Sequence, residues 1–239
     1  MKTFAIGDIH GHFSTLKKLL DQLPINWQVD ELVFLGDLID RGPESREVVE
    51  FVMNLHKENL AKVRVLKGNH EEMMLESYNS KDDFSHWLSN GGDTTYSSYC
   101  KSNKVCWEIF NKEFPIEIYD YLKNRPIRYE NDHAIFVHAG SKCDNTGQWR
   151  TDSSAIALWY RGKDFFRKYR GKTIVVGHTP TNKIRIMLGE ALMPIDEMTA
   201  WSQNNIIAID CGAGHEGRLC AVELPGGNLF YQPVPKKFL

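Results

Sequence analysis

The sequence predicts an α/β fold, and three observations support this prediction. A unit of a short apolar run, a polar loop with glycine and an amphipathic stretch occurs three times within the first seventy residues. Such alternation is typical of a parallel sheet with crossover helices. The last third of the chain contains a further series of short apolar runs, whereas residues 79–125 contain no long one. We therefore expect a sheet-based domain with an insertion in its middle.

The three repeated units are the first elements in order. Apolar runs at 3–6, 32–35 and 63–66 have the length of buried strands. Apolar residues at helical spacing follow the first run at 16–23 and the second at 48–55. Ligands of parallel sheets bind beyond the carboxyl ends of the strands, where the polar loops lie. We therefore expect the three loops to meet there and to form the functional site.

The rest of the chain predicts a mostly helical insertion at 79–125, packed beside the sheet, and then more strands. These strands are expected at 128–129, 134–137, 173–176, 206–209, 219–224 and 229–231. The Pro-Gly-Gly-Asn turn at 225–228 predicts that the last two form a hairpin. With 239 residues and no linker, the chain is expected to form a single domain over 1–239.

The composition excludes several classes of protein. Apolar residues make up 42% and charged residues 25%, as in soluble globular proteins. No apolar run approaches the roughly 18–20 residues of a membrane span, and no signal-peptide pattern is present. A net charge of −2 gives no electrostatic case for a nucleic-acid or membrane partner. Five cysteines without a CxxC pair are expected to be reduced thiols, which indicates the cytoplasm.

Side chains that commonly bind metal ions follow the apolar runs directly. They are Asp8, His10, Asp37, Asp40, Asn69, His70, His138 and His178. A single Gly-Asp pair is a common turn. The Gly-Asp-x-His-Gly pattern at 7–11, however, would occur by chance only roughly once in 10⁵ positions at average composition. Because comparable clusters follow the other runs, turns alone do not explain the pattern, and we predict one shared site.

Five motifs at these positions resemble a known family. Gly7-Asp-Ile-His-Gly11, Gly36-Asp-Leu-Ile-Asp-Arg-Gly42 and Gly68-Asn-His-Glu71 resemble the signature motifs of the phosphoprotein-phosphatase branch of the calcineurin-like metallophosphoesterases. Val137-His-Ala-Gly140 and Gly177-His-Thr-Pro180 resemble its two later histidine motifs. The resemblance implies a β-sandwich of two mixed sheets flanked by helices, and usually a monomer.

A finer resemblance points to one part of this branch. Segments 69–74, 86–92, 177–180 and 209–213 are similar to the protein phosphatase of bacteriophage lambda and its bacterial relatives. The resemblance extends from Phe4 to about Leu224 and is loose over 95–130.

The resemblance implies a centre of two divalent metal ions. Asp37 would bridge them, Asp8 and His10 would complete the first, and the second would take Asn69, His138 and His178. Oxygen and imidazole ligands without thiolate suit manganese, iron or zinc. Manganese is expected because the lambda-type relatives typically use it. Two metal ions about 3.5–4 Å apart can jointly activate a water, which implies direct in-line attack of metal-bound hydroxide on phosphorus.

The resemblance also assigns the residues that handle the substrate. Arg41 matches a phosphate-binding arginine of the family, and Arg161 aligns with the second; the planar guanidinium can pair bidentately with phosphate oxygens. His70 matches the general acid, and Asp40 matches the carboxylate that orients it. His12, His56, His86, His133 and His215 lie in no comparable motif, and no role is assigned to them.

Two substrate classes stay open. The leading hypothesis is a serine/threonine protein phosphatase, and the alternative is a symmetrical bis(5'-nucleosyl)-tetraphosphatase that splits diadenosine tetraphosphate. Asp40 and Glu71 favour the protein phosphatase. One large group of the dinucleotide enzymes lacks an aspartate at the position of Asp40 and tends to have aspartate at the position of Glu71. A binding scaffold is disfavoured by the intact ligand positions. A nuclease is disfavoured by the Asp40-Arg41 pair and the net charge.

Overall fold

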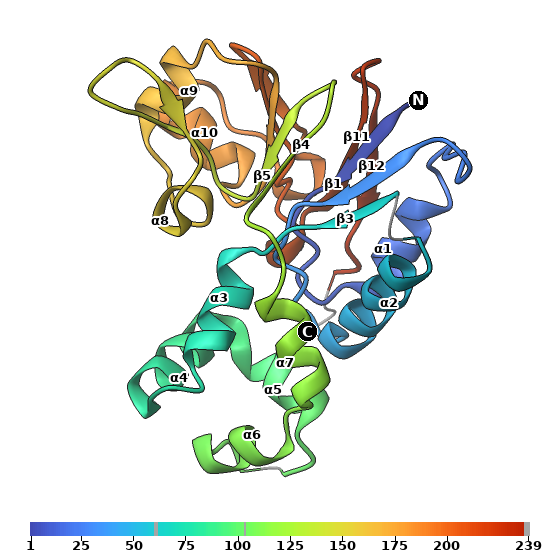
Figure 1. Cartoon of the computed structure of the whole chain (residues 1–239), viewed down its shortest axis with the longest axis vertical. Helices are drawn as coiled ribbons and strands as arrows, with labels where there is room; N and C mark the ends of the chain where they lie inside the picture. Colours follow the sequence, from blue (N-terminus) through green and yellow to red (C-terminus); the bar gives the residue numbers. More distant parts are fainter. Residues whose placement is uncertain (60–61, 103, 237–239) are drawn as a thin grey trace.

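A computed structural model describes residues 1–59, 62–102 and 104–236. Within these ranges two five-stranded sheets stand side by side, with helices on their outer faces and a further group of helices at one end (Figure 1). Both sheets contain parallel and antiparallel pairs. The predicted α/β sandwich of two mixed sheets flanked by helices is thereby confirmed.

The first sheet contains the three strands of the repeated units. Its order is β12 (Leu229–Pro233), β11 (Arg218–Leu224), β1 (Thr3–Ile6), β2 (Glu31–Phe34) and β3 (Val63–Val65). The strands β1, β2 and β3 are parallel, whereas β11 runs antiparallel to β1 and β12. The predicted parallel start and the predicted final hairpin are both confirmed.

The second sheet is built from the last third of the chain. Its order is β4 (Arg128–Glu130), β5 (Ile135–Val137), β8 (Ile174–Val176), β10 (Ile206–Ala208) and β9 (Trp201–Gln203). Sequence analysis missed β9 and the small hairpin of β6 (Lys142–Cys143) and β7 (Trp149–Arg150). Two or three residues are too short for an alternating apolar pattern to be visible.

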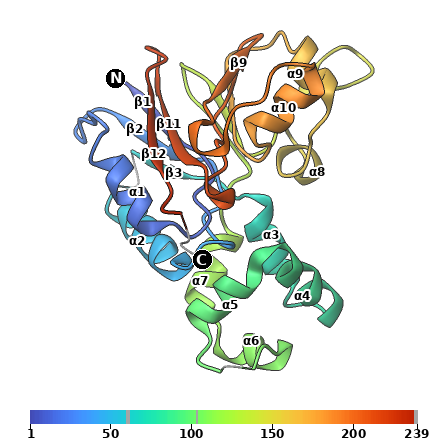
Figure 2. The same ribbon diagram turned by 180° about the vertical axis from the view of Figure 1, so that it is seen from behind.

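Helices cover the outer face of each sheet. α1 (Phe13–Leu20) and α2 (Ser45–Glu58) pack against the first sheet. α8 (Ser154–Ala157), α9 (Lys163–Lys168) and α10 (Thr181–Leu188) lie beside the second, as Figure 2 shows from behind. Short 3-10 turns, η2 (Ile195–Glu197) and η3 (Ala213–His215), lie in the loops of the last third. No helix in the described ranges has the length and apolarity needed to cross a bilayer.

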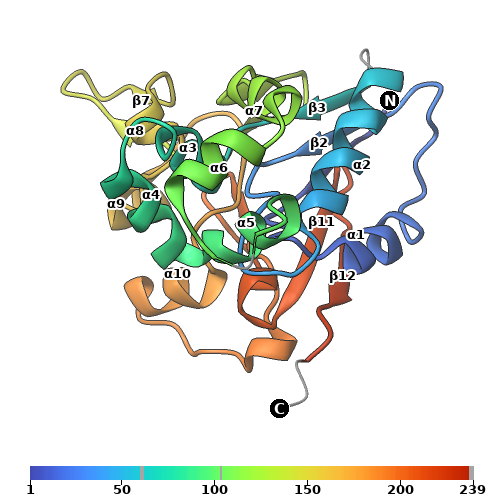
Figure 3. The same ribbon diagram turned by 90° about the horizontal axis from the view of Figure 1, so that it is seen from below.

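The insertion at 79–125 is helical, as expected. After α3 (Asn69–Glu76) it contains α4 (Lys81–Trp87), the kinked π-helical segment η1 (Leu88–Gly92), α5 (Asp93–Tyr99), α6 (Trp107–Glu113) and α7 (Ile116–Lys123). Figure 1 shows these helices grouped at one end of the molecule, and Figure 3 views the molecule from that end. They adjoin the ends of the strands from which the motif loops emerge.

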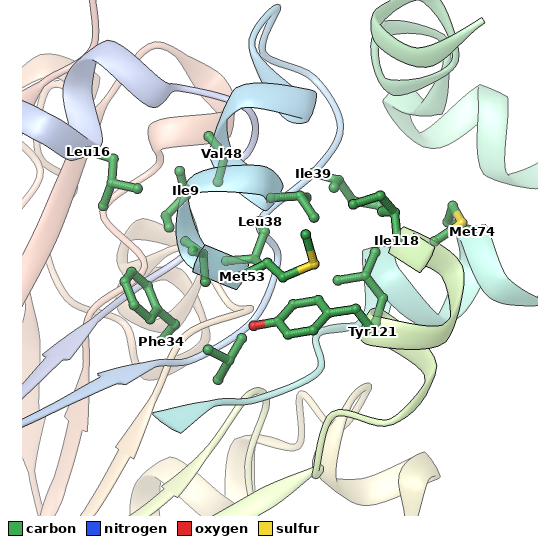
Figure 4. Packing of buried hydrophobic residues seen from close by; sticks show 14 of the residues in the cluster. Ile9, Leu16, Phe34, Leu38, Ile39, Val48, Met53, Met74, Ile118 and Tyr121 are labelled. Atoms are coloured by element: carbon green, nitrogen blue, oxygen red, sulfur yellow. The ribbon is translucent and has the colours of Figure 1, made fainter. Parts of the chain in front are cut away.

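Alternation along the strands divides the core into layers. Phe4 and Ile6 of β1 belong to a cluster with α1, α2 and the insertion, whereas Ala5 belongs to the layer between the sheets. Successive side chains of a strand point to opposite faces, so a strand that is buried on both faces separates these layers. Figure 4 shows part of the first cluster, in which Met53 of α2 lies near Tyr121 of the insertion. This shared core fixes the insertion against the motif loops.

Candidate metal centre and active site

The carboxyl ends of the strands bring the predicted metal ligands together. Asp8 and His10 follow β1, and Asp37 follows β2. His138 and His178 follow β5 and β8 of the second sheet. All five side chains are buried. The site therefore lies between the two sheets, and both contribute to it.

Asp37 is the centre of this arrangement. Among the described residues, two groups of three have ligand atoms within 4.8 Å of one another: His10, Asp37 and His70, and Asp37, His138 and His178. Asp37 belongs to both groups, as a carboxylate that bridges two metal ions must. Asp8 lies outside them: its two carboxylate oxygens accept the backbone N–H of His178 at 3.1 and 2.9 Å.

Three imidazoles are oriented as metal ligands. Nδ1 of His10 donates to the Ile39 carbonyl at 2.9 Å, and Nδ1 of His138 donates to the Leu35 carbonyl at 3.0 Å. The ring of His178 forms a hydrogen bond with the backbone of Trp159. Burial lowers the pKa of all three imidazoles, which favours the neutral form. Because Nδ1 of His10 and Nδ1 of His138 each donate to a carbonyl, Nε2 of both rings is left unprotonated, as in histidine ligands of metal sites.

Possible metal-donor atoms gather at one point. The amide oxygen of Asn69 lies 2.9 Å from Nε2 of His138 and 2.7 Å from Nδ1 of His178. Nε2 of His138 is unprotonated, because Nδ1 of that ring donates to the Leu35 carbonyl. An amide oxygen and imidazole nitrogens grouped this closely suit a divalent metal ion. The donor set therefore fits a metal ion at the predicted second position.

The buried carboxylates of the site also indicate that a cation binds here. Burial, together with the charges of Asp210 and Asp37, raises the pKa of Asp8 well above its usual value. Burial raises the pKa of Asp210 to about 6. Although burial opposes ionisation of Asp37 as well, the imidazoles around it hold its pKa low. Carboxylates so close together repel one another, and a bound cation relieves the repulsion. Sequence analysis assigned no role to Asp210, although it lies in segment 209–213 of the resemblance.

The backbone of the site is strained. Five of the candidate residues have positive φ, namely His10 (48°), Asp37 (52°), Asp40 (73°), Arg41 (70°) and His178 (62°). For residues other than glycine this conformation costs about 1–2 kcal/mol each. Such strain persists where surrounding structure imposes it, and it is concentrated at functional sites.

Glu71 ties two motif loops together. Its carboxylate accepts the backbone N–H groups of Gly68 at 2.7 Å, Asp37 at 2.9 Å and Leu38 at 2.8 Å. A Cβ on Gly68 would lie 2.2 Å from Oδ1 of Asp37, so only glycine permits this approach. Sequence analysis used Glu71 only as a marker of the family. Its place three residues after the start of a helix signals a capping role, but not the contacts across the loops.

His70 and Asp40 form the predicted dyad. Nδ1 of His70 lies 2.7 Å from Oδ2 of Asp40, and both side chains are buried. Burial acts to lower the pKa of His70, but the charge of Asp37 and the hydrogen bond with Asp40 together raise it above the ordinary value. The dyad therefore favours the imidazolium form of His70.

A pocket of about 220 Å³ opens beside the dyad and the metal ligands. Both predicted arginines line it: Nη2 of Arg41 lies 2.9 Å from Nε2 of His70, and Nη2 of Arg161 donates to the His178 carbonyl at 3.2 Å. Sequence analysis missed Asn90, Trp159, Pro180, Lys183 and His215 as lining residues. Burial and the charges of Arg41 and Lys183 lower the pKa of His215. The excess of cationic groups suits an anionic substrate.

Comparison with known proteins defines the class. The family model described as calcineurin-like phosphoesterase matches residues 1–193. The chain therefore belongs to the calcineurin-like phosphoesterase family, and it is a metallophosphoesterase, as its motifs predict.

The similar proteins are named either as dinucleoside tetraphosphatases or as protein phosphatases. The asymmetrical bis(5'-nucleosyl)-tetraphosphatase PrpE of Geobacillus sp. (strain WCH70) is 28% identical over 268 residues, covering 100% of this chain and 98% of that protein. Serine/threonine-protein phosphatase 2 of Escherichia coli (strain K12) is 32% identical over 133 residues, covering 56% of this chain and 58% of that protein. A solved structure provisionally described as a diadenosine tetraphosphatase shares the fold, with a TM-score of 0.67, 20% identity, and coverage of 98% of this chain and 94% of that one.

Proposed function

We propose that this metallophosphoesterase is a serine/threonine protein phosphatase, a phosphomonoesterase that acts as a monomer in the cytoplasm on phosphorylated proteins. The observation that carries the proposal is the buried His70–Asp40 dyad at 2.7 Å beside the pocket. Hydrolysis of a phosphoserine releases an alkoxide, which needs a proton as its bond to phosphorus breaks. A phosphoanhydride releases a phosphate group that is stable as an anion, so it needs such an acid less.

Two divalent metal ions are part of the proposal. Asp8, His10 and Asp37 would hold one, and Asp37, Asn69, His138 and His178 would hold the other. When bound, they supply Lewis acidity and an activated water. Manganese is the proposed metal, and iron or zinc would suit the same donors.

The protein's own residues perform the remaining tasks. Arg41 and Arg161, which both line the pocket, bind the phosphate oxygens, and their planar guanidinium groups set the orientation of the phosphate. His70 gives its Nε2 proton to the leaving oxygen. Asp40 accepts the Nδ1–H of His70 and thereby holds the ring in place and stabilises its charged form.

A dinucleoside tetraphosphatase is the second candidate, because the pocket holds more cationic side chains than one phosphate needs. Lys183 lines it together with both arginines. Trp159, which is 39% exposed, offers a ring on which a base could stack. The PrpE relatives carry the name of an asymmetrical enzyme, whereas the sequence analysis considered symmetrical cleavage.

One side-by-side assay tests both candidates. Metal-stripped protein is refilled with Mn²⁺ and given either a phosphoserine peptide or diadenosine tetraphosphate. A larger kcat/KM on the peptide supports the protein phosphatase, whereas preference for the dinucleotide overturns it. In the latter case ADP alone indicates symmetrical cleavage, and ATP with AMP indicates asymmetrical cleavage. Activity on neither substrate contradicts both candidates.

A further inference from the structure

We propose that Trp87 and Thr95, two residues of the insertion, are positioning residues that hold Asp40 in its dyad with His70. The inference rests on the proposed function in one respect, since it takes His70 to be the general acid. It adds a task for the insertion, which otherwise packs beside the sheets and lines the pocket with Asn90.

The first support is the set of hydrogen bonds to the Asp40 carboxylate. Oγ1 of Thr95 donates to Oδ1 at 2.7 Å. Nε1 of Trp87 donates to Oδ2 at 3.0 Å and lies 3.2 Å from Oδ1. His70 occupies Oδ2 at 2.7 Å. Both oxygens therefore have partners from the insertion, and rotation of the carboxylate away from His70 would break these bonds.

Burial makes these two donors indispensable to the carboxylate. Asp40, Trp87 and Thr95 are each 0% exposed. A carboxylate that is removed from water needs hydrogen bonds from the protein. The indole and hydroxyl donors are uncharged, so they satisfy the carboxylate without replacing the imidazole as its cationic partner. The dyad therefore keeps its geometry through neutral groups that come from a separate part of the chain.

The insertion also holds the strained backbone of the same loop. Asp40 and Arg41 have φ of 73° and 70°. The N–H of Asp40 donates to Oγ1 of Thr95 at 2.9 Å, and the N–H of Arg41 donates to the Gly91 carbonyl at 3.0 Å. Gly91 has φ of 99°, and a Cβ there would lie 2.8 Å from Cγ of Arg41. The kink at η1 thus lies between Trp87 and Thr95 in the chain. It lets both side chains and the Gly91 carbonyl reach the loop that contains Asp40 and Arg41.

The chain offers a matched control for each donor. Oγ of Ser97, in the same helix as Thr95, donates to the Asp93 carbonyl at 2.8 Å. Nε1 of Trp107, also in the insertion, donates to the Ser77 carbonyl at 2.8 Å. These hydrogen bonds also come from a hydroxyl and an indole, but they do not involve the loop that contains Asp40. The substitutions Ser97→Ala and Trp107→Phe therefore measure the effect of losing an ordinary hydrogen bond of the insertion.

The test measures how the loss of activity depends on the leaving group. Mn²⁺-loaded Thr95→Val and Trp87→Phe proteins are assayed on a phosphoserine peptide and on p-nitrophenyl phosphate, whose leaving group needs little protonation. Since general acid catalysis contributes roughly 10²–10⁴-fold, we expect kcat on the peptide to fall by about tenfold or more. The kcat on p-nitrophenyl phosphate and the bound manganese should change little. Thr95→Ser, which keeps the hydroxyl, should restore activity, and both control variants should behave like wild type.

A second readout does not depend on turnover. The low-field proton signal of Nδ1–H of His70 is recorded by NMR in the Zn²⁺-loaded protein, and it should shift or vanish in Thr95→Val but persist in Ser97→Ala. An unchanged signal, or equal losses on both substrates, overturns the positioning role. If wild type prefers the dinucleotide, the proposed function fails, while the NMR result still decides the positioning role. If Trp87→Phe does not fold, the Thr95 variants decide it.

Discussion

The motif loops and the insertion both reach the Asp40–His70 dyad, but they contribute different chemistry. The loops bring charged and metal-binding groups to the carboxyl ends of strands, where backbone geometry places them. The insertion brings an indole and a hydroxyl, which are 47 and 55 residues away from Asp40 in the chain. The comparison teaches that one segment can hold the reactive groups while another, to which the motifs assign no role, supplies hydrogen bonds to one of them.

Replacing Asp37 should have the largest effect, because it removes the carboxylate shared by both ligand groups. We expect Asp37→Ala to lose bound metal and to reduce activity to background, as metal stripping should also do. Metal content by elemental analysis and kcat on the phosphopeptide check this. Asp196→Asn, at an exposed ion pair with Lys236, is the control. A variant that still bound two metal ions per chain would contradict the bridging role.

Replacing His70 should reduce turnover but spare the metal. His70→Asn should lower kcat by roughly 10²–10⁴-fold, which is the usual contribution of a general acid. Bound manganese should stay near the wild-type amount, which separates this variant from the Asp37 variant. The exposed His86 provides the control His86→Asn. Survival of full activity would show that another group protonates the leaving oxygen.

The dyad should also be visible in the pH dependence. Activity requires protonated His70, so kcat on the phosphopeptide should decline as the pH rises through the raised pKa of His70. Asp40→Asn removes a charge that stabilises the imidazolium, so the decline should move to lower pH. A pH–rate profile of both proteins checks the direction. A shift to higher pH, or none, would contradict the role of Asp40 in the dyad.

Replacing Lys183 should have the smallest effect and depend on the substrate. Lys183 is exposed at the edge of the pocket, so its loss should raise KM by roughly threefold, in line with the modest worth of exposed charges. If the pocket accepts several phosphates, the increase should be larger for diadenosine tetraphosphate than for a phosphopeptide. Lys168→Ala, at an exposed ion pair with Asp164, provides the control. Equal changes for both substrates would remove the support that this lysine gives to the second candidate.

Much of the fold could be predicted because its signals are local. Strand β1 coincides with the predicted run 3–6, and β2 (Glu31–Phe34) begins one residue before the run at 32–35. The strands β6, β7 and β9 were missed because two or three residues carry no periodic pattern. Edge positions such as β9 are decided by pairing with a neighbour that is already in place.

Residue types and their positions after apolar runs were enough to predict one shared site that includes Asp8 and His178, whereas the metal-ligand, phosphate-binding and dyad roles came from the family resemblance. A strand that ends in glycine and a polar side chain delivers that side chain to the edge of the sheet, and this depends only on nearby residues. The roles of Trp87, Thr95, Lys183 and His215 emerged only with the folded chain, because packing between distant segments creates their contacts. Trp87 reaches Asp40 because the insertion shares a buried core with α2, and no local pattern encodes that contact.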